Sequence, residues 1–314
     1  MSAPRVSIVV PCHDAAPWLA ETLESALAQT WAEKEILVVD DGSADGSLAI
    51  ARSFENRGVR VLAQANRGAA AARNAGMQQA RGDYVQFVDA DDLLTPDKLA
   101  AQVALLESHG RDCVATCRWG RFAGDPATAR FIDDDLFRDL APLDFLLLHT
   151  GNHRMMHPAA WLTPRRVADR AGPWNEALSL NDDGEYFARV VTAARRIVYS
   201  PAGATLYRSR LPGSLSRRRS APALASLARS VELIAGHVRG IEDSPRVRRA
   251  LADYWQRLVY ELYPDAPGLG RRAAAEVRAL GGSTLPPERG SHERMLARLC
   301  GWRLARRLCR RFRS

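Results

Sequence analysis

The residue types best suited to chemistry follow one apolar segment. Residues 84–88 have the composition of a buried strand, and three carboxylates, Asp89, Asp91 and Asp92, come directly after them. Asp89 and Asp91 are two positions apart, so in an extended segment they point the same way and can share one hard cation. A divalent ion held by few protein oxygens usually completes its coordination with substrate phosphates. Taken alone, the pattern also fits an ordinary acidic loop before a helix, with Asp92 or Thr95 as the cap.

Alternating strands and helices are needed to position this acidic turn. Short β-branched runs predict strands, and apolar residues at helical spacing predict the helices between them. The expected strands cover 5–11, 35–39, 59–63 and 84–88, and the expected helices cover 17–29, 45–54 and 68–80. Such alternation is typical of an α/β fold with a parallel sheet and helices on its faces.

Substrate phosphates at this edge of the sheet raise the question of a nucleotide site. The sequence has no glycine-rich phosphate loop of the Walker or dinucleotide type after the first strand. The first strand is followed by Pro11-Cys12-His13-Asp14, whereas carboxylates follow the second and fourth strands. We therefore expect phosphate charge to be met by a metal ion and by arginines. Asp41, next to Gly42, could accept hydrogen bonds from a base or a ribose, as acids do in other nucleotide-binding α/β folds.

An ordered set of motifs resembles one known family, the inverting glycosyltransferases of family 2, which have the GT-A fold. The resemblance covers roughly the first two-thirds of the chain, and its segments are 6–11, 38–43, 66–68, 72–76, 83–92, 171–176 and 182–189. It implies a mixed, mostly parallel sheet with flanking helices. It also implies a nucleotide-sugar donor, most simply a UDP-sugar, and a saccharide or lipid-linked acceptor.

The resemblance assigns roles to residues of the donor site. Asp41 would hold the uracil or ribose, and the loop after the first strand would line the base pocket. Asp89 and Asp91 match the family's metal motif, so they would hold Mn²⁺ or Mg²⁺, with Asp91 the more direct ligand. The full set implied for the donor nucleotide is Pro11, His13, Asp14, Asp41, Arg73, Asp89 and Ala90.

The resemblance also implies a catalytic base. Asp183 matches the second acid of the family's Glu-Asp pair, and Asp182 or Arg189 could orient it. Where Asn181 and Asp182 stand, the family often has Glu or Gly-Glu, which leaves the choice between Asp182 and Asp183 open; we favour Asp183. Inversion at an anomeric carbon is a single displacement, so the acceptor hydroxyl needs a carboxylate within hydrogen-bond reach to take its proton. An acidic helix start with ordinary capping roles is the alternative.

The chain after the catalytic motifs changes character. A loop over 209–220 is rich in Arg, Ser, Gly and Pro, and Arg208 or Arg210 could contact the donor diphosphate there; a basic linker is the alternative. We place a domain boundary in this loop. Residues 1–213 form the predicted catalytic domain, divided into a nucleotide-binding half (1–110) and an acceptor and base half (111–213), and 214–314 form a helical region.

The last predicted helix, 288–312, combines an apolar stripe with many arginines. Eight arginines lie over 294–313, and, counted against Glu293 just before them, they nearly account for the formal net charge of +8. Such a helix resembles a segment that lies in an anionic membrane interface. The alternative is a helix whose stripe packs on the catalytic domain while its arginines face water. Nucleic acid is not an expected partner, because no base-reading motif accompanies the charge.

Composition is that of an ordinary folded enzyme. The chain has 314 residues, 46% of them hydrophobic, and five scattered cysteines that form no zinc pattern. No run reaches the ~18–20 apolar residues of a membrane span. We expect a cytoplasmic protein that can also associate peripherally with the inner face of the membrane.

These patterns favour a metal-dependent, inverting hexosyltransferase that works in cell-surface glycan synthesis. A non-catalytic nucleotide-sugar-binding or scaffold protein on the same fold is the alternative, but a protein that only binds needs no base at Asp183. A nucleotidyltransferase that makes sugar nucleotides is a weaker rival. Such enzymes usually open with a glycine-rich, basic signature after the first strand, which is absent here.

Overall fold

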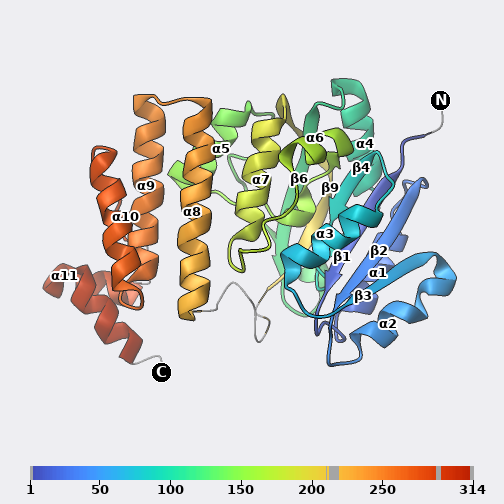
Figure 1. Ribbon diagram of the computed structural model, residues 1–314, viewed down its shortest axis with the longest axis horizontal. Helices are drawn as coiled ribbons and strands as arrows, with labels where there is room; N and C mark the ends of the chain where they lie inside the picture. The colour runs from blue at the N-terminus through green and yellow to red at the C-terminus, as the bar shows by residue number, and fades with distance from the viewer. Residues whose placement is uncertain (1–2, 210, 212–218, 288–290, 312–314) are drawn as a thin grey trace.

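A parallel sheet forms the amino-terminal half of the protein (Figure 1). The computed structural model describes residues 3–209, 211, 219–287 and 291–311. The sheet has the order β3-β2-β1-β4-β8, in which the first four strands are parallel and β8 is antiparallel. Its strands are β1 (Val6–Cys12), β2 (Lys34–Asp41), β3 (Val59–Gln64), β4 (Tyr84–Phe87) and β8 (Thr163–Pro164). The four predicted strands and their parallel pairing are confirmed.

Helices cover the sheet as the alternating pattern predicted. They are α1 (Leu19–Leu27), α2 (Ser47–Ser53), α3 (Ala69–Gln79) and α4 (Lys98–His109), with a short 3-10 turn η1 (Glu55–Arg57). The helix α3 packs closely on β1 and β2. A Cβ atom at Gly76 of α3 would lie 2.4 Å from Cγ1 of Val9, so this contact requires glycine. The alanine-rich face of α3 thus brings Arg73 close to the carboxyl ends of the strands.

A second, four-stranded sheet with the order β5-β9-β6-β7 adjoins the first. It contains β5 (Leu93–Leu94), β6 (Cys113–Phe122), β7 (Arg130–Phe131) and β9 (Arg196–Arg208). The strand β9 has a bulge opposite Cys117 and Arg118 of β6. Since β5 follows the acidic turn directly and pairs with β9, this sheet fixes the far side of the turn.

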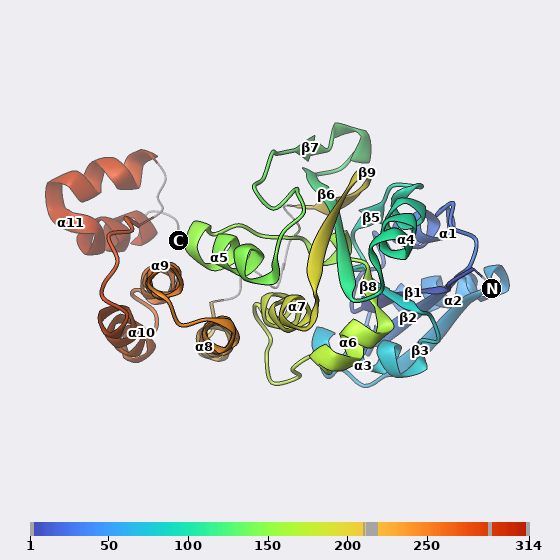
Figure 2. The same cartoon turned by 90° about the horizontal axis from the view of Figure 1, so that it is seen from above.

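The remaining helices pack beside this second sheet and extend away from it (Figure 2). Helices α7 and α8 are neighbours, α9 packs on α5, α8 and α10, and Ser220 and Ser244 cap α8 and α9. Their bounds are α5 (Pro142–Asn152), α6 (Arg165–Ala171), α7 (Asp182–Ala193), α8 (Ala221–Ile241), α9 (Pro245–Leu262), α10 (Pro267–Ala279) and α11 (Ser291–Arg311), with 3-10 turns η2 (Pro126–Thr128) and η3 (Pro158–Ala160).

The apolar core continues from the parallel sheet into these helices. One cluster of buried side chains includes Val9 of β1, Trp174, Val191 of α7, Leu251 of α9 and Val277 of α10. The C-terminal helices therefore share buried surface with the half of the protein that contains the sheets. The predicted boundary at 213 stays a prediction, and residues 212–218 lie outside the described part of the chain.

The last helix, α11, bends at Gly301, which has a φ of 75°. Just past the bend, Trp302 packs edge-on against Tyr260 of α9, with ring centroids 5.0 Å apart. Met295 and Leu299 are 62% and 81% exposed on the preceding arm. One part of the helix therefore packs on the protein while another presents apolar side chains to solvent. Among the described residues, no helix is long and apolar enough to cross a membrane.

Candidate active site

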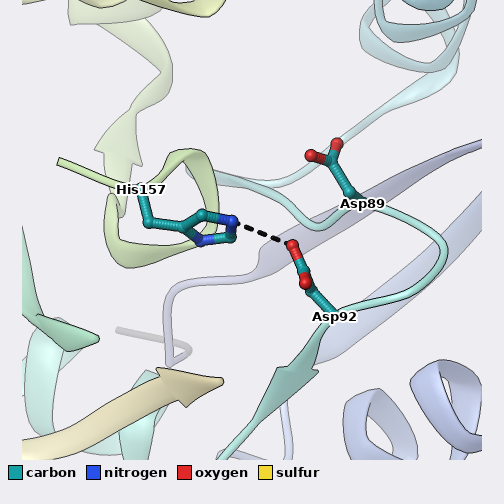
Figure 3. A group of neighbouring side chains, drawn as sticks. All are labelled: Asp89, Asp92 and His157. Atoms are coloured by element: carbon teal, nitrogen blue, oxygen red, sulfur yellow. Dashed lines mark ion pairs between the residues drawn. The ribbon is translucent and has the colours of Figure 1, made fainter. Parts of the chain in front are cut away.

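The acidic turn after β4 is fixed by a buried carboxylate (Figure 3). Asp92 is completely buried, and its Oδ1 accepts a hydrogen bond from the backbone N–H of Arg208 at 2.8 Å. Its Oδ2 lies 2.9 Å from Nε2 of His157. Nδ1 of His157 faces the backbone N–H of Ala159 at 3.3 Å, so Nδ1 is the acceptor and Nε2 carries the proton toward Asp92. The turn is thereby tied to β9 and to η3.

Arg208, a predicted diphosphate contact, is buried beneath the turn. Its Nε donates to the carbonyl of Asp91 at 2.9 Å, its guanidinium pairs with Glu21, and it stacks on Phe122 at 4.4 Å. These contacts make Arg208 a support of the acidic turn, and a contact with the diphosphate stays a prediction. Arg210, its predicted companion, lies outside the described residues.

Arg73 joins the acidic turn to α7. Its Nη2 lies 2.7 Å from Oδ1 of Asp89, and its Nη1 lies 2.9 Å from Oδ2 of Asp182. The guanidinium lies 4.4 Å from the ring of Trp174, and the Arg73 side chain is only 6% exposed. Burial opposes the charge of Arg73, but the two carboxylates outweigh it and raise the pKa of the guanidinium. Arg73 was predicted to bind the donor; these pairings place it between two candidate functional carboxylates.

The carboxylates of the turn have unequal electrostatic environments. Desolvation would raise the pKa of Asp89, but Arg73 outweighs it and holds that pKa below its usual value. For Asp91, burial and then the charges of Asp92 and Asp89 raise the pKa to about 8. Asp89 keeps 31% of its side chain exposed, so one member of the group faces solvent. Repulsion of this kind is what a bound divalent cation would relieve, and oxygen ligands suit Mg²⁺ and Mn²⁺.

The structure also identifies a three-residue group that the sequence did not predict. Asp89, Asp92 and His157 each offer a ligand atom within 4.8 Å of the others, and Asp91 is not part of this group (Figure 3). Asp92 had been interpreted as a possible cap. His157 gave no signal, because its partner lies far away in the sequence. The direct metal role of Asp91 stays a prediction.

Asp183 lies in the first turn of α7, next to Asp182. Its Oδ1 accepts a hydrogen bond from the N–H of Gly184 at 2.8 Å. Burial, and then the charge of Asp182, raise the pKa of Asp183 to about 6, while Arg73 acts in the opposite direction. A carboxylate with a pKa just below neutrality is both ionised at working pH and basic enough to take a proton. This environment favours Asp183 over Asp182 as the base, since Asp182 is paired with Arg73.

Arg189 does not contact Asp183 in the way that an orienting role would require. Its Nε and Nη2 pair with both carboxylate oxygens of Glu185, at 2.8 and 2.9 Å, and it also donates to the carbonyl of Ala171. His237 of α8 lies 3.2 Å from the same Glu185. Arg189, about one and a half turns beyond the candidate base, therefore ties α7 to the end of α6, while His237 links Glu185 to α8.

Asp41 shapes the loop that leads into α3. It is 2% exposed, and its Oδ1 accepts hydrogen bonds from Gln64 Nε2 at 2.7 Å and from the N–H of Arg67 at 2.9 Å. Its Oδ2 accepts from the N–H of Gly68 at 2.7 Å. The predicted contact of Asp41 with uracil or ribose stays a prediction.

The other predicted donor residues lie at the same edge of the sheet. Pro11 is buried near the end of β1, and His13 follows, with its Nδ1 3.0 Å from the carbonyl of Asp41. Asp14 has a φ of 48°, and its Oδ1 accepts from the N–H of Ala44 at 2.8 Å. Ala90 is buried in the acidic turn. Because the strands are parallel, their carboxyl ends lie at one edge of the sheet. The segments that follow the strands are therefore close together.

Two solved glycosyltransferases share this architecture. Staphylococcus aureus TarS 1–349, solved with UDP-GlcNAc, superposes with a TM-score of 0.65 at 19% identity, covering 88% of this chain and 90% of that one. The mannosyltransferase PcManGT of Pyrobaculum calidifontis, solved with GDP-Man and Mn²⁺, gives a TM-score of 0.54 at 21% identity, covering 89% and 75%. The fold is that of GT-A glycosyltransferases, as the sequence predicted.

The family model for glycosyl transferase family 2 matches residues 7–170, and the chain belongs to that family. The uncharacterized glycosyltransferase RT0329 of Rickettsia typhi is 30% identical over 185 residues, which are 58% of this chain and 57% of that protein. The succinoglycan biosynthesis protein ExoO of Rhizobium meliloti is 29% identical over 221 residues, 68% of this chain and 63% of ExoO. The chain thus spans less than two-thirds of the length of either relative.

Replacing Arg73 with methionine should strongly destabilise the protein. Asp89 and Asp182 would then lie side by side without their shared cation, at a cost on the order of 3 kcal/mol in the free energy of unfolding. Arg57→Met is the matched control, because the pair of Arg57 with Glu24 is exposed (44% and 55%) and should contribute little to stability. Urea unfolding of both variants measures the difference; equal losses would show that the Arg73 pairings are not specially stabilising.

Proposed function

We propose that this protein is an inverting, metal-dependent hexosyltransferase. It would move a sugar from a nucleoside-diphosphate sugar, most simply a UDP-sugar, to a saccharide or lipid-linked acceptor in cell-surface glycan synthesis. The observation that carries the proposal is a pair of carboxylates at one edge of the sheet, Asp89 in the acidic turn and Asp183 at the start of α7. Arg73 links the two elements, because it pairs with Asp89 and with Asp182, the neighbour of Asp183. Family membership and the similarity to ExoO, a succinoglycan biosynthesis protein, support the same conclusion.

Asp183 would act as the general base. The acceptor hydroxyl attacks the anomeric carbon, the bond from that carbon to the diphosphate breaks, and the hydroxyl proton passes to the Asp183 carboxylate. A pKa of about 6 leaves this carboxylate mostly ionised at neutral pH. No covalent enzyme intermediate is needed, because one displacement inverts the configuration. We assign Asp182 and Arg73 the role of positioning the base-bearing turn.

The acidic turn would bind the donor's diphosphate through Mn²⁺ or Mg²⁺. Asp91 and Asp89 are our proposed ligands, since burial and then the neighbouring carboxylates raise the pKa of Asp91, and Asp89 is partly exposed. Bound there, the metal would stabilise negative charge on the leaving diphosphate as a Lewis acid. The segment around Asp41, Pro11 and His13 would hold the nucleoside. Within the catalytic unit, 1–110 would carry these donor contacts and 111–213 the acceptor and the base.

The tail would bring the enzyme to its acceptor. We propose that the exposed arm of α11, with Met295 and Leu299, binds the anionic inner face of a membrane reversibly. Anionic lipid attracts arginines near the surface at about 1 kcal/mol each, and the eight arginines of 294–313 supply the charge. The protein itself would be cytoplasmic and peripheral.

Asp183→Asn should separate binding from chemistry. Asparagine keeps the size of aspartate but cannot take a proton, so turnover should fall by about 10²–10⁴-fold while donor affinity stays near wild type. Release of UDP from a panel of UDP- and GDP-sugars, together with calorimetric titration of the donor, measures the two quantities.

Asp182→Asn is the matched control, and it should retain far more turnover than Asp183→Asn. If Asp182→Asn is the crippled variant, the base is one residue away from our assignment; if neither matters, the proposed chemistry is wrong. In the wild type, kcat/KM should rise with pH through about 6, because the base must lose its proton before it can act.

Metal removal should abolish transfer and weaken donor binding. Asp91→Asn should lose metal-dependent binding and, without metal, should raise the melting temperature, because it removes a carboxylate whose charge burial and neighbouring acids disfavour. Asp133→Ala, which alters an exposed acid of another loop, should change neither. Isothermal titration with Mn²⁺ and thermal melts decide this. Loss of Mn²⁺ binding in His157→Ala with normal binding in Asp91→Asn would instead assign the metal to the Asp89, Asp92 and His157 group.

Vesicle binding tests the tail. The full-length protein should sediment with phosphatidylglycerol vesicles at low salt, and a version that ends at Pro287 should remain in the supernatant. The double change Met295→Ser and Leu299→Ser should weaken sedimentation. Ile132→Ser, at a side chain 55% exposed in another loop, should have no effect. Equal sedimentation of the full-length and shortened proteins would favour a tail that only packs on the protein.

A further inference from the structure

The loop before the catalytic-base helix is held by a helix from a later part of the chain. Helix α8 lies beside α7 (Figure 1), and its Ser226 faces this loop. Ser226 Oγ accepts hydrogen bonds from the N–H groups of Ser179 and Leu180, at 2.8 and 3.0 Å, and donates to the carbonyl of Leu180 at 3.2 Å. One hydroxyl has one donor and two acceptor positions, so all of its hydrogen-bonding capacity serves the loop.

Ser230, on the same face of α8 one turn later, holds the next residue of the loop. It is completely buried, and its Oγ accepts a hydrogen bond from Nδ2 of Asn181 at 2.8 Å while donating to the carbonyl of Leu227 in its own helix at 2.9 Å. Asn181 is the N-cap of α7, and its carbonyl accepts the hydrogen bond from Glu185 at 3.3 Å that begins the helix. Ser230 therefore forms a hydrogen bond with Asn181, the N-cap residue of α7.

Asn181 needs such support, because it has a φ of 59°. Residues other than glycine adopt this left-handed conformation at a cost and keep it when surrounding contacts hold it. The structure also makes room for the Asn181 side chain: a Cβ atom at Gly184 would lie 2.4 Å from Asn181 Oδ1. Two contacts thus fix the conformation of the turn: Gly184 of α7 leaves space for the Asn181 side chain, and Ser230 of α8 accepts its hydrogen bond.

We infer that Ser226 and Ser230 are positioning residues for the catalytic base. This inference rests on the proposed role of Asp183. Asn181 directly precedes Asp182 and Asp183, so the conformation of this turn sets the direction of both carboxylates. Helix α8 lies beyond residues 7–170, which the family model matches, and beyond the predicted boundary at 213. The helical region therefore completes the active site by fixing the position of its base.

The first test measures the turn itself, without reference to activity. Hydrogen exchange of the full chain, followed by mass spectrometry, should show faster exchange over 179–185 in the double variant Ser226→Ala and Ser230→Ala. Val238→Ala is the matched control: Val238 is completely buried about two turns further along α8, so its loss weakens packing without touching the loop. Unchanged exchange in the serine variant, or equal loosening in the control, would overturn the inference.

The second test links the turn to catalysis, with UDP-GlcNAc as the donor and release of UDP as the signal. The serine variant should lose about 10–100-fold in kcat, because a small displacement of the base is costly, while its KM for UDP-GlcNAc stays near wild type. Val238→Ala should keep its kcat. Normal kcat in the serine variant overturns the inference. If the wild type turns over neither UDP-GlcNAc nor any donor of the panel, the proposed function fails, and the exchange experiment alone decides whether the serines hold the turn.

Discussion

The candidate site depends on the guanidinium of Arg73, a charged group in a buried position where charge is costly. Arg73 reaches from α3 into a nearly dry position between Asp89 and Asp182, and its desolvation is tolerated because both carboxylates are within 3 Å. Removing either partner would leave charge uncompensated, so the end of β4 and the start of α7 are held at a fixed separation. Trp174 lies under the guanidinium and stacks on Tyr186 of α7, with ring centroids 4.1 Å apart. The same contacts thus join donor-side and base-side carboxylates.

Local patterns in the sequence predicted much of this arrangement. The β-branched run before Asp89, the acids after the second strand and the acidic helix start at Asp183 each depend on neighbours in sequence, and the parallel topology then brings them to one edge. The pairing of Asp92 with His157 could not be predicted in the same way, because it joins segments that are distant in sequence. Glu185 and Arg189, by contrast, are four residues apart on one helix, a spacing at which opposite charges pair.

The C-terminal helices follow a similar logic. The sequence predicted a helical region over 214–314, and helices α8 to α11 lie there, with Ser220 and Ser244 as the caps of α8 and α9. The sequence did not predict their contact with the candidate active site. That contact is made by serine hydroxyls, and in the sequence these serines look like ordinary helix residues. Shared burial with the sheet and the contacts of Ser226 and Ser230 join α8 to the half of the protein that carries the candidate site.

The stereochemistry of the reaction tests the central claim most directly. In the single displacement assigned to Asp183, an α-linked nucleotide sugar must yield a β-configured product, with no covalent intermediate. Proton NMR of wild-type protein with UDP-GlcNAc and Mn²⁺, recorded before mutarotation, distinguishes the anomers of the first sugar released. The account predicts that the β anomer appears first and that its formation requires the Asp183 carboxylate. First appearance of the α anomer would contradict it.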